Sequence, residues 1–85
     1  MPNYKSFKAT LEEEYNFPAQ YTFKFIVKAG LKEQILELLP GAKKSERVSK
    51  NGNFVSITLS QIMKNSEEIV YIYEKASKIK GVISL

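Results

Sequence analysis

The sequence has 85 residues and a net charge of +4, and 44% of its residues are hydrophobic, which fits one small globular domain. Because it contains neither cysteine nor histidine, it excludes disulfides, thiolate or imidazole metal ligands, and Ser–His or Cys–His nucleophile systems. No apolar run approaches the ~18 residues that span a bilayer, and no secretory signal opens the chain, so we expect a cytoplasmic protein that binds no membrane, metal or cofactor.

The first 19 residues are expected to be a lead-in that contains a short helix. Ser6 or Thr10 is placed to cap this helix, because a hydroxyl oxygen can accept a bond from a free backbone N–H group. The Phe17-Pro18 pair ends it, since the residue before a proline is pushed out of helical geometry. Residues 20–85 are expected to form the folded domain.

Residues 20–29 alternate between apolar and polar side chains, many of them aromatic or β-branched, which predicts a strand with one buried face. Gly30 ends this strand. Four aliphatic side chains then recur every three or four residues, which is typical of an amphipathic helix. The helix is stopped by Pro40-Gly41. Its apolar residues are Leu31, Ile35, Leu38 and Leu39.

Residues 43–50 are polar and rich in lysine, which predicts an edge strand, because charged side chains protect an exposed sheet edge. Asn51-Gly52 predicts a hairpin with a type I′ turn, in which both central residues take positive φ. The next strand alternates again from Phe54 to Met63. Its predicted buried side chains are Val55, Ile57, Leu59 and Met63.

A second helix is predicted to begin at Asn65 or Ser66, with Gly81 as the glycine just past its end. Glutamates in its first turn and lysines in its last turn suit the helix dipole. Residues 82–85 supply a last short strand. The order of elements is therefore βαββαβ, the ferredoxin-like plan of the α+β class. That plan is a four-stranded antiparallel sheet with both helices on one face, and here the first and third strands are central.

The "KNGNFVSI" stretch fits neither a phosphate-binding loop nor the RNA-binding strand of an RNA-recognition motif. A phosphate-binding loop needs a helix after its glycines, whereas a strand follows Gly52. RNA-recognition motifs present several aromatic rings on this strand, and only Phe54 is available. Weak nucleic-acid binding by dispersed basic residues remains the alternative function. Those residues are Lys24, Lys28, Lys43, Lys44, Arg47 and Lys50.

The chain resembles the YbeD-like proteins, which are small bacterial proteins of unknown function. The resemblance is carried by "FPAQYTFKFIVKAG" (17–30) and "SKNGNFVSITLSQIMKNSEEIVYIYEKASKIKGVISL" (49–85), with a Phe-Pro before the first strand, a Ser-Lys-Gly-Asn-aromatic hairpin and a C-terminal Val-x-x-Leu. The chain departs from that pattern by the extra Asn51 and by a short first helix and following strand. The resemblance implies a ferredoxin-like fold similar to ACT-type regulatory domains.

ACT domains bind small metabolites near a glycine between the first strand and the first helix, and Gly30 has that position here. The resemblance implies no catalytic residue. Acylphosphatases share the fold but have an arginine after the first strand, whereas the one arginine here is Arg47. We therefore expect a non-enzymatic regulatory or interaction module whose partner is a protein, a second copy of the chain or a metabolite, with nucleic acid disfavoured. The ligand-binding candidates are Gly30, Ile26, Phe54 and Ile62.

Overall fold

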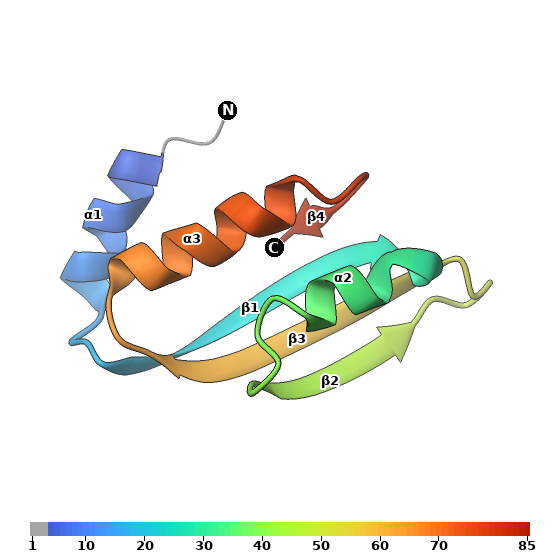
Figure 1. The fold of residues 1–85 in the computed structure, drawn as a ribbon, viewed down its shortest axis with the longest axis horizontal. Coiled ribbons are helices and arrows are strands. Elements are labelled where there is room, and N and C mark those ends of the chain that lie inside the picture. Colours follow the sequence, from blue (N-terminus) through green and yellow to red (C-terminus); the bar gives the residue numbers. More distant parts are fainter. Residues whose placement is uncertain (1–3) are drawn as a thin grey trace.

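The computed structural model describes residues 4–85, and from residue 19 onward the elements follow the predicted βαββαβ order (Figure 1). Residues 1–3 of the predicted lead-in lie outside the described part. In chain order the elements are α1 (Tyr4–Glu14), β1 (Ala19–Lys28), the 3-10 helix η1 (Ala29–Leu31), α2 (Lys32–Leu36), β2 (Lys43–Val48), β3 (Phe54–Met63), α3 (Ser66–Ser77) and β4 (Ile83–Ser84).

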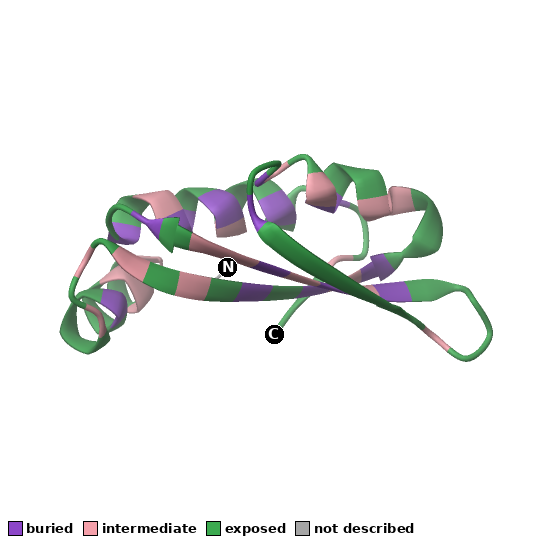
Figure 2. Cartoon of the chain, turned by 90° about the horizontal axis from the view of Figure 1, so that it is seen from below, coloured by how far each residue is buried: buried purple, intermediate pink, exposed green. Residues whose placement is uncertain are grey.

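The four strands form one antiparallel sheet in the order β2-β3-β1-β4, which confirms the ferredoxin-like prediction. The apolar strands β1 and β3 are central, and the charged strand β2 lies at an edge with every residue exposed. Helices α2 and α3 cover one face of the sheet (Figures 1 and 2). Among residues 4–85, no helix is long and apolar enough to cross a membrane.

The core lies between the sheet and these two helices, and the alternation in β1 and β3 selects which side chains enter it. Phe23 and Phe25 of β1 pair with Leu59 and Ile57 of β3, and all four side chains are fully buried. Each contributes roughly 1.5–3 kcal/mol by leaving water. Figure 2 shows the result as buried and exposed bands that alternate along the strands.

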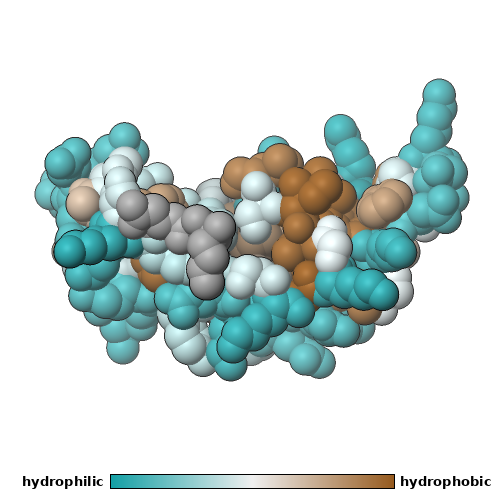
Figure 3. All heavy atoms as spheres, turned by 90° about the horizontal axis from the view of Figure 1, so that it is seen from above, coloured by the Kyte–Doolittle hydropathy of each residue, from teal (hydrophilic) through white to brown (hydrophobic). Residues whose placement is uncertain are grey.

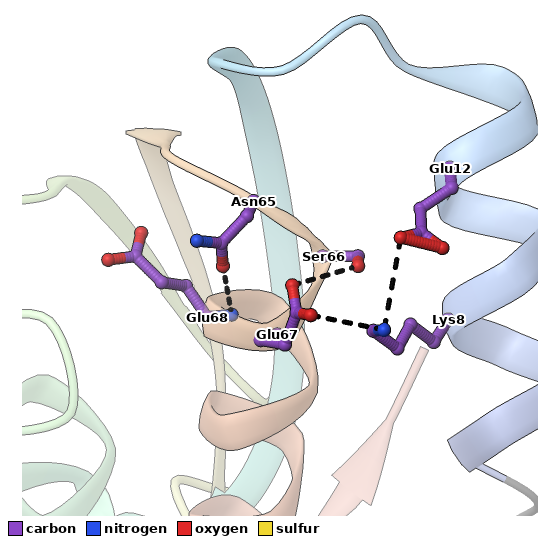
Figure 4. A network of polar contacts seen from close by, with 6 residues as sticks. All are labelled: Lys8, Glu12, Asn65, Ser66, Glu67 and Glu68. Carbon is purple, nitrogen blue, oxygen red and sulfur yellow. Dashed lines mark hydrogen bonds and ion pairs between the residues drawn. The ribbon is translucent and has the colours of Figure 1, made fainter.

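Helix α1 packs against the beginning of α3, as Figure 4 shows. Lys8 Nζ lies 3.0 Å from Glu67 Oε2 and 3.8 Å from Glu12 Oε1. Leu11 is buried, and the Phe7 ring meets the Tyr73 ring edge-on at 5.3 Å. Phe7 and Leu11 thus complete the helical layer and the core, and they leave the other face of the sheet uncovered.

Helix α3 begins as predicted, because Asn65 is its N-cap and the side-chain Oδ1 accepts the Glu68 backbone N–H at 2.9 Å (Figure 4). The end of the helix differs from the prediction. Its C-cap is Lys78, and Gly81, at φ +73°, lies in a separate turn closed by the Val82 N–H and the Ile79 carbonyl. Gly81 supplies the positive φ of that turn, so it is not the residue that terminates the helix.

The hairpin between β2 and β3 forms, but the predicted type I′ turn is wrong. Such a turn needs positive φ at two successive residues, and in this loop only Gly52, at φ +78°, has it. The Asn51 side chain explains the difference, since its Oδ1 accepts the Asn53 N–H at 3.1 Å and the Ser49 hydroxyl at 3.0 Å. These bonds hold a longer loop, which the Ser49 N–H and the Phe54 carbonyl close at 2.8 Å.

Two further boundaries differ from the sequence predictions. The predicted helix caps Ser6 and Thr10 lie inside α1, where the Thr10 hydroxyl donates to the Ser6 carbonyl at 3.1 Å. Helix α2 is only five residues long, and the chain tightens after it, with the Leu38 N–H bonded to the Ile35 carbonyl. Pro40 keeps the helix from continuing through Leu39, because a proline disfavours helical geometry at the residue before it.

Candidate functional site

The face of the sheet that α2 and α3 leave uncovered, here called the open face, is defined by the strand register. Side chains of paired residues lie on the same face, and Ile26 and Ser56 alternate with the buried Phe25 and Val55. The open face therefore comprises Gln20, Thr22, Lys24, Ile26 and Lys28 of β1; Lys43, Ser45 and Arg47 of β2; Phe54, Ser56, Thr58, Ser60 and Ile62 of β3; and Ile83 of β4.

The open face carries basic side chains, whereas the acidic side chains lie elsewhere on the molecule. Four basic side chains lie on it, and no glutamate of the described chain does. The other nine of the 13 basic residues balance the nine acidic residues elsewhere, so the open face carries a charge equal to the whole net charge of +4. Eight of the glutamates lie on or beside the helices, and the ninth, Glu46, points from β2 toward α2, where it bonds Lys32 Nζ at 3.0 Å.

The predicted apolar candidates do not form one cluster. Ile26 and Phe54 are diagonal neighbours, because Ile26 pairs with Ser56, two residues from Phe54. Ile62 lies eight residues from Phe54 along β3, roughly 27 Å at strand geometry, with 63% of its surface exposed. Only Ile26 and Phe54 can therefore act together.

Ile83 completes this cluster and was missed in the sequence analysis. It pairs with Ile26 across β4 and β1, and 51% of it is exposed. We call Ile26, Phe54 and Ile83 the apolar triad. Figure 3 shows apolar side chains gathered on the side of the molecule where β4 lies. The period of β4 alone could not place Ile83, because the strand has two residues and its register depends on β1.

Five of the six basic candidates lie on the open face or beside it. Lys24, Lys28, Lys43 and Arg47 lie on it, while Lys50 in the hairpin loop lines a shallow depression of about 310 Å³ together with Phe54. Lys44 does not belong to the group, because it pairs with the buried Leu59 and so lies on the helix side.

A second depression, of about 370 Å³, lies beside the first and is polar. Lys24, Ser45, Arg47, Ser56 and Thr58 line it from the open face. Glu46 also borders it, but its carboxylate is held by Lys32. The depression therefore offers ammonium, guanidinium and hydroxyl donors to an anionic group.

Gly30, the remaining candidate, lies in the exposed 3-10 helix η1, away from the open face. A Cβ added there would meet no atom within 4 Å, and the backbone does not require glycine. Within residues 4–85, no group of three or more acidic side chains is placed to hold a metal ion.

Residues 12–85, most of the chain, match the family described as "Protein of unknown function (DUF493)". The chain belongs to the DUF493 family. UPF0250 proteins from Haemophilus influenzae strains PittEE, PittGG and 86-028NP are each 28% identical to it over 81 residues, which cover 87% of this chain and 88% of theirs. The resemblance to YbeD-like proteins is thereby confirmed.

A solved structure is similar to the fold described above over most of both chains. The solution structure of protein HP0495 from H. pylori superposes with a TM-score of 0.71 at 25% identity, and the match covers 84% of this chain and 85% of that one. The comparisons therefore identify the family and the fold of this chain, and its open face provides the evidence for a function.

Proposed function

We propose that this DUF493 protein is a non-enzymatic interaction module that binds an acidic partner protein through the open face of its sheet. The separation of charge carries the proposal, because a uniformly basic surface attracts a complementary acidic one and repels other basic surfaces. Lys24 and Arg47, which line the same depression, are the central contacts. A regulatory role would then follow from occupation of this face by the partner.

The apolar triad favours a protein over a nucleic acid. Single strands bind open sheets by stacking successive bases on aromatic rings, and among residues 4–85 only the ring of Phe54 lies on this face. Ile26 and Ile83 offer aliphatic surface, which a protein side chain can cover and a base cannot stack on. A face-to-face dimer is disfavoured too, since two copies would bring four positive charges against four.

Charge reversal on β2 tests the proposal with a matched control. Arg47→Glu places a carboxylate on the open face, whereas Lys44→Glu makes a similar change three residues away on the opposite face. We expect Arg47→Glu to lower partner capture from the native cell lysate at least ten-fold, and Lys44→Glu to leave it nearly unchanged. Both substitutions are exposed, so both variants should remain folded.

Nuclease treatment separates the two classes of partner. Capture of a protein that survives nuclease and is lost in Arg47→Glu supports the proposal. Loss of all capture after nuclease, with binding to single-stranded RNA that falls steeply with salt, would establish the nucleic-acid alternative instead. Equal capture by Arg47→Glu and wild type would show that the open face is not the binding surface.

A further inference from the structure

A further concave surface lies away from the open face, where α1, α3, β1 and β4 meet. We call it the aromatic groove. Its cavity volume is about 440 Å³, within the range of small-molecule sites. Its walls include the side chains of Tyr4, Phe7, Tyr21 and Tyr73, with Ser77 and Ser84 at its margin.

The rings of the groove are held in place by contacts with the core and with one another. Phe7 meets Tyr73 edge-on at 5.3 Å, and Tyr21 meets Tyr73 at 6.3 Å with an angle of 86° between the rings. Tyr73 also contacts the fully buried Phe23 and Phe25, at 5.2 and 5.8 Å. Because the core already holds these rings in place, a ligand that binds there requires little ordering of their side chains.

Two hydroxyl groups meet at the groove. The phenol oxygens of Tyr21 and Tyr73 lie 2.9 Å apart and share one hydrogen bond. One hydroxyl proton of the pair is used in that bond, so the other proton and the remaining lone pairs are available to a ligand. Burial is the main cause that raises the pKa of each phenol, so both stay neutral.

Among residues 4–85, the groove is lined by aromatic, serine and leucine side chains, the last from Leu85, and none of them is charged at neutral pH. An anionic ligand would therefore lose its hydration there without gaining a basic side chain among the described residues. A neutral ring system would instead bury its faces against the aromatic walls, in the edge-to-face and offset geometries that such rings prefer.

We propose that the aromatic groove binds a neutral, ring-containing small molecule that carries one hydrogen-bonding group, held by the Tyr21–Tyr73 hydroxyl pair. The site shares strand β1 with the depressions beside Phe54 and Lys24, but it shares no lining residue with them. It is also distinct from the Gly30 position. The proposal is independent of the proposed function, and either can fail without the other.

Indole is a suitable probe because it is neutral and has one N–H donor. Titrated into the full chain and followed by ¹H–¹⁵N spectra, it should shift the backbone signals of Phe7, Tyr21, Tyr73 and Ser84 in a saturable way, while Phe54 in the hairpin stays unchanged. Indole-3-acetate, which adds a carboxylate to the same ring, should bind roughly ten-fold more weakly because that charge must be desolvated. Equal or tighter binding of indole-3-acetate would overturn the assignment of a neutral ligand.

Two variants test the location and the chemistry. Ser77→Trp adds a ring at the margin of the groove from an exposed helix end, so it should abolish the indole shifts. The double variant Tyr21→Phe/Tyr73→Phe keeps both rings and leaves no unpaired hydroxyl, so it should fold. Its affinity for indole should fall about five-fold, the usual worth of one hydrogen bond, while its affinity for benzene stays the same.

Tyr71→Phe is the matched control, because Tyr71 lies on the same helix, is 56% exposed and lies outside the groove lining. It should bind indole as the wild type does. Indole shifts that are not saturable, that are scattered over the molecule, or that persist in folded Ser77→Trp would overturn the proposal. An unchanged affinity of the double Phe variant for indole would overturn the role of the hydroxyl pair.

Discussion

Replacing Ile57 with glutamate tests whether one face of β3 is buried and the other is exposed, as the strand register indicates. Ile57 is fully buried, and the residue paired with it on β2 is Glu46, so a new carboxylate would have no cation opposite it. A buried, unpaired carboxylate takes up a proton rather than remain charged. The cost of that proton can be worked out from the ordinary pKa of glutamate.

Holding a glutamate neutral at pH 7, when its ordinary pKa is about 4.3, costs roughly 3.7 kcal/mol at 1.36 kcal/mol per pH unit. Loss of the isoleucine burial adds about 1.5–3 kcal/mol. The total of roughly 5–7 kcal/mol compares with a stability of about 4–13 kcal/mol for a chain of this length. At pH 7 the Ile57→Glu variant should therefore lose a large share of the wild-type stability, or all of it if that stability lies near the lower end of the range.

The pH dependence gives the prediction a clear sign. The folded pKa of this glutamate is raised above its unfolded value, so the penalty is absent below about pH 4.3 and grows as the pH rises above it. Ile57→Gln, which loses the same apolar surface without a titrating group, is the matched control. In urea unfolding followed by circular dichroism, the two variants should be nearly equal at pH 4.5 and differ by up to about 3.7 kcal/mol at pH 7.

Phe54→Glu provides the comparison on the open face. Phe54 is 41% exposed and pairs with Lys28, so the new carboxylate keeps water and gains a cation opposite it. Its stability should change by about 1 kcal/mol or less. If Phe54→Glu unfolds the protein as completely as Ile57→Glu, or if Ile57→Glu matches Ile57→Gln at pH 7, the assignment of faces is refuted.

Two local features give further predictions. Gly52→Ala should destabilise the protein by about 1–2 kcal/mol, because Gly52 has φ +78°, whereas Gly30→Ala should be neutral or stabilising by about 0.4–1 kcal/mol. Thermal melting of the pair would show this, and equal melting temperatures would contradict it. Asn65→Ala should cost about 1 kcal/mol by removing the bond to the Glu68 N–H, as measured by urea unfolding, and an unchanged midpoint would mean that the cap is not needed.

The hairpin shows where a residue pattern is informative and where it is not. Asn51-Gly52 correctly places a turn, because both residue types tolerate turn geometry and charged or alternating strands flank them. The type of turn was wrong, because the Asn51 side chain bonds the Ser49 hydroxyl and the Asn53 N–H instead of supporting a second positive φ. Such a choice depends on several competing bonds of similar strength, which no dipeptide preference resolves.

The candidate site was predictable strand by strand but not as a surface. The alternation in β1 puts Lys24 and Ile26 on the face opposite the buried phenylalanines, and the alternation in β3 puts Phe54 on the face opposite Val55. The position of Lys44 behind the sheet was not foreseen, because β2 is exposed throughout and has no apolar period that marks its faces. Ile83 was missed for the related reason that two residues are too few to show a period.

The sequence by itself determined the elements and the core. Apolar side chains spaced at two or at three and four residues can be buried only as the strands β1 and β3 and the helix α3, so the ferredoxin-like plan follows from local pattern and chain order. Only the tertiary structure decided how surface groups meet. The apolar triad, the charge of the open face and the Tyr21–Tyr73 pair each join residues distant in sequence, 52 apart for the two tyrosines. Their meeting depends on cross-strand register and helix docking, which long-range packing sets and local pattern does not.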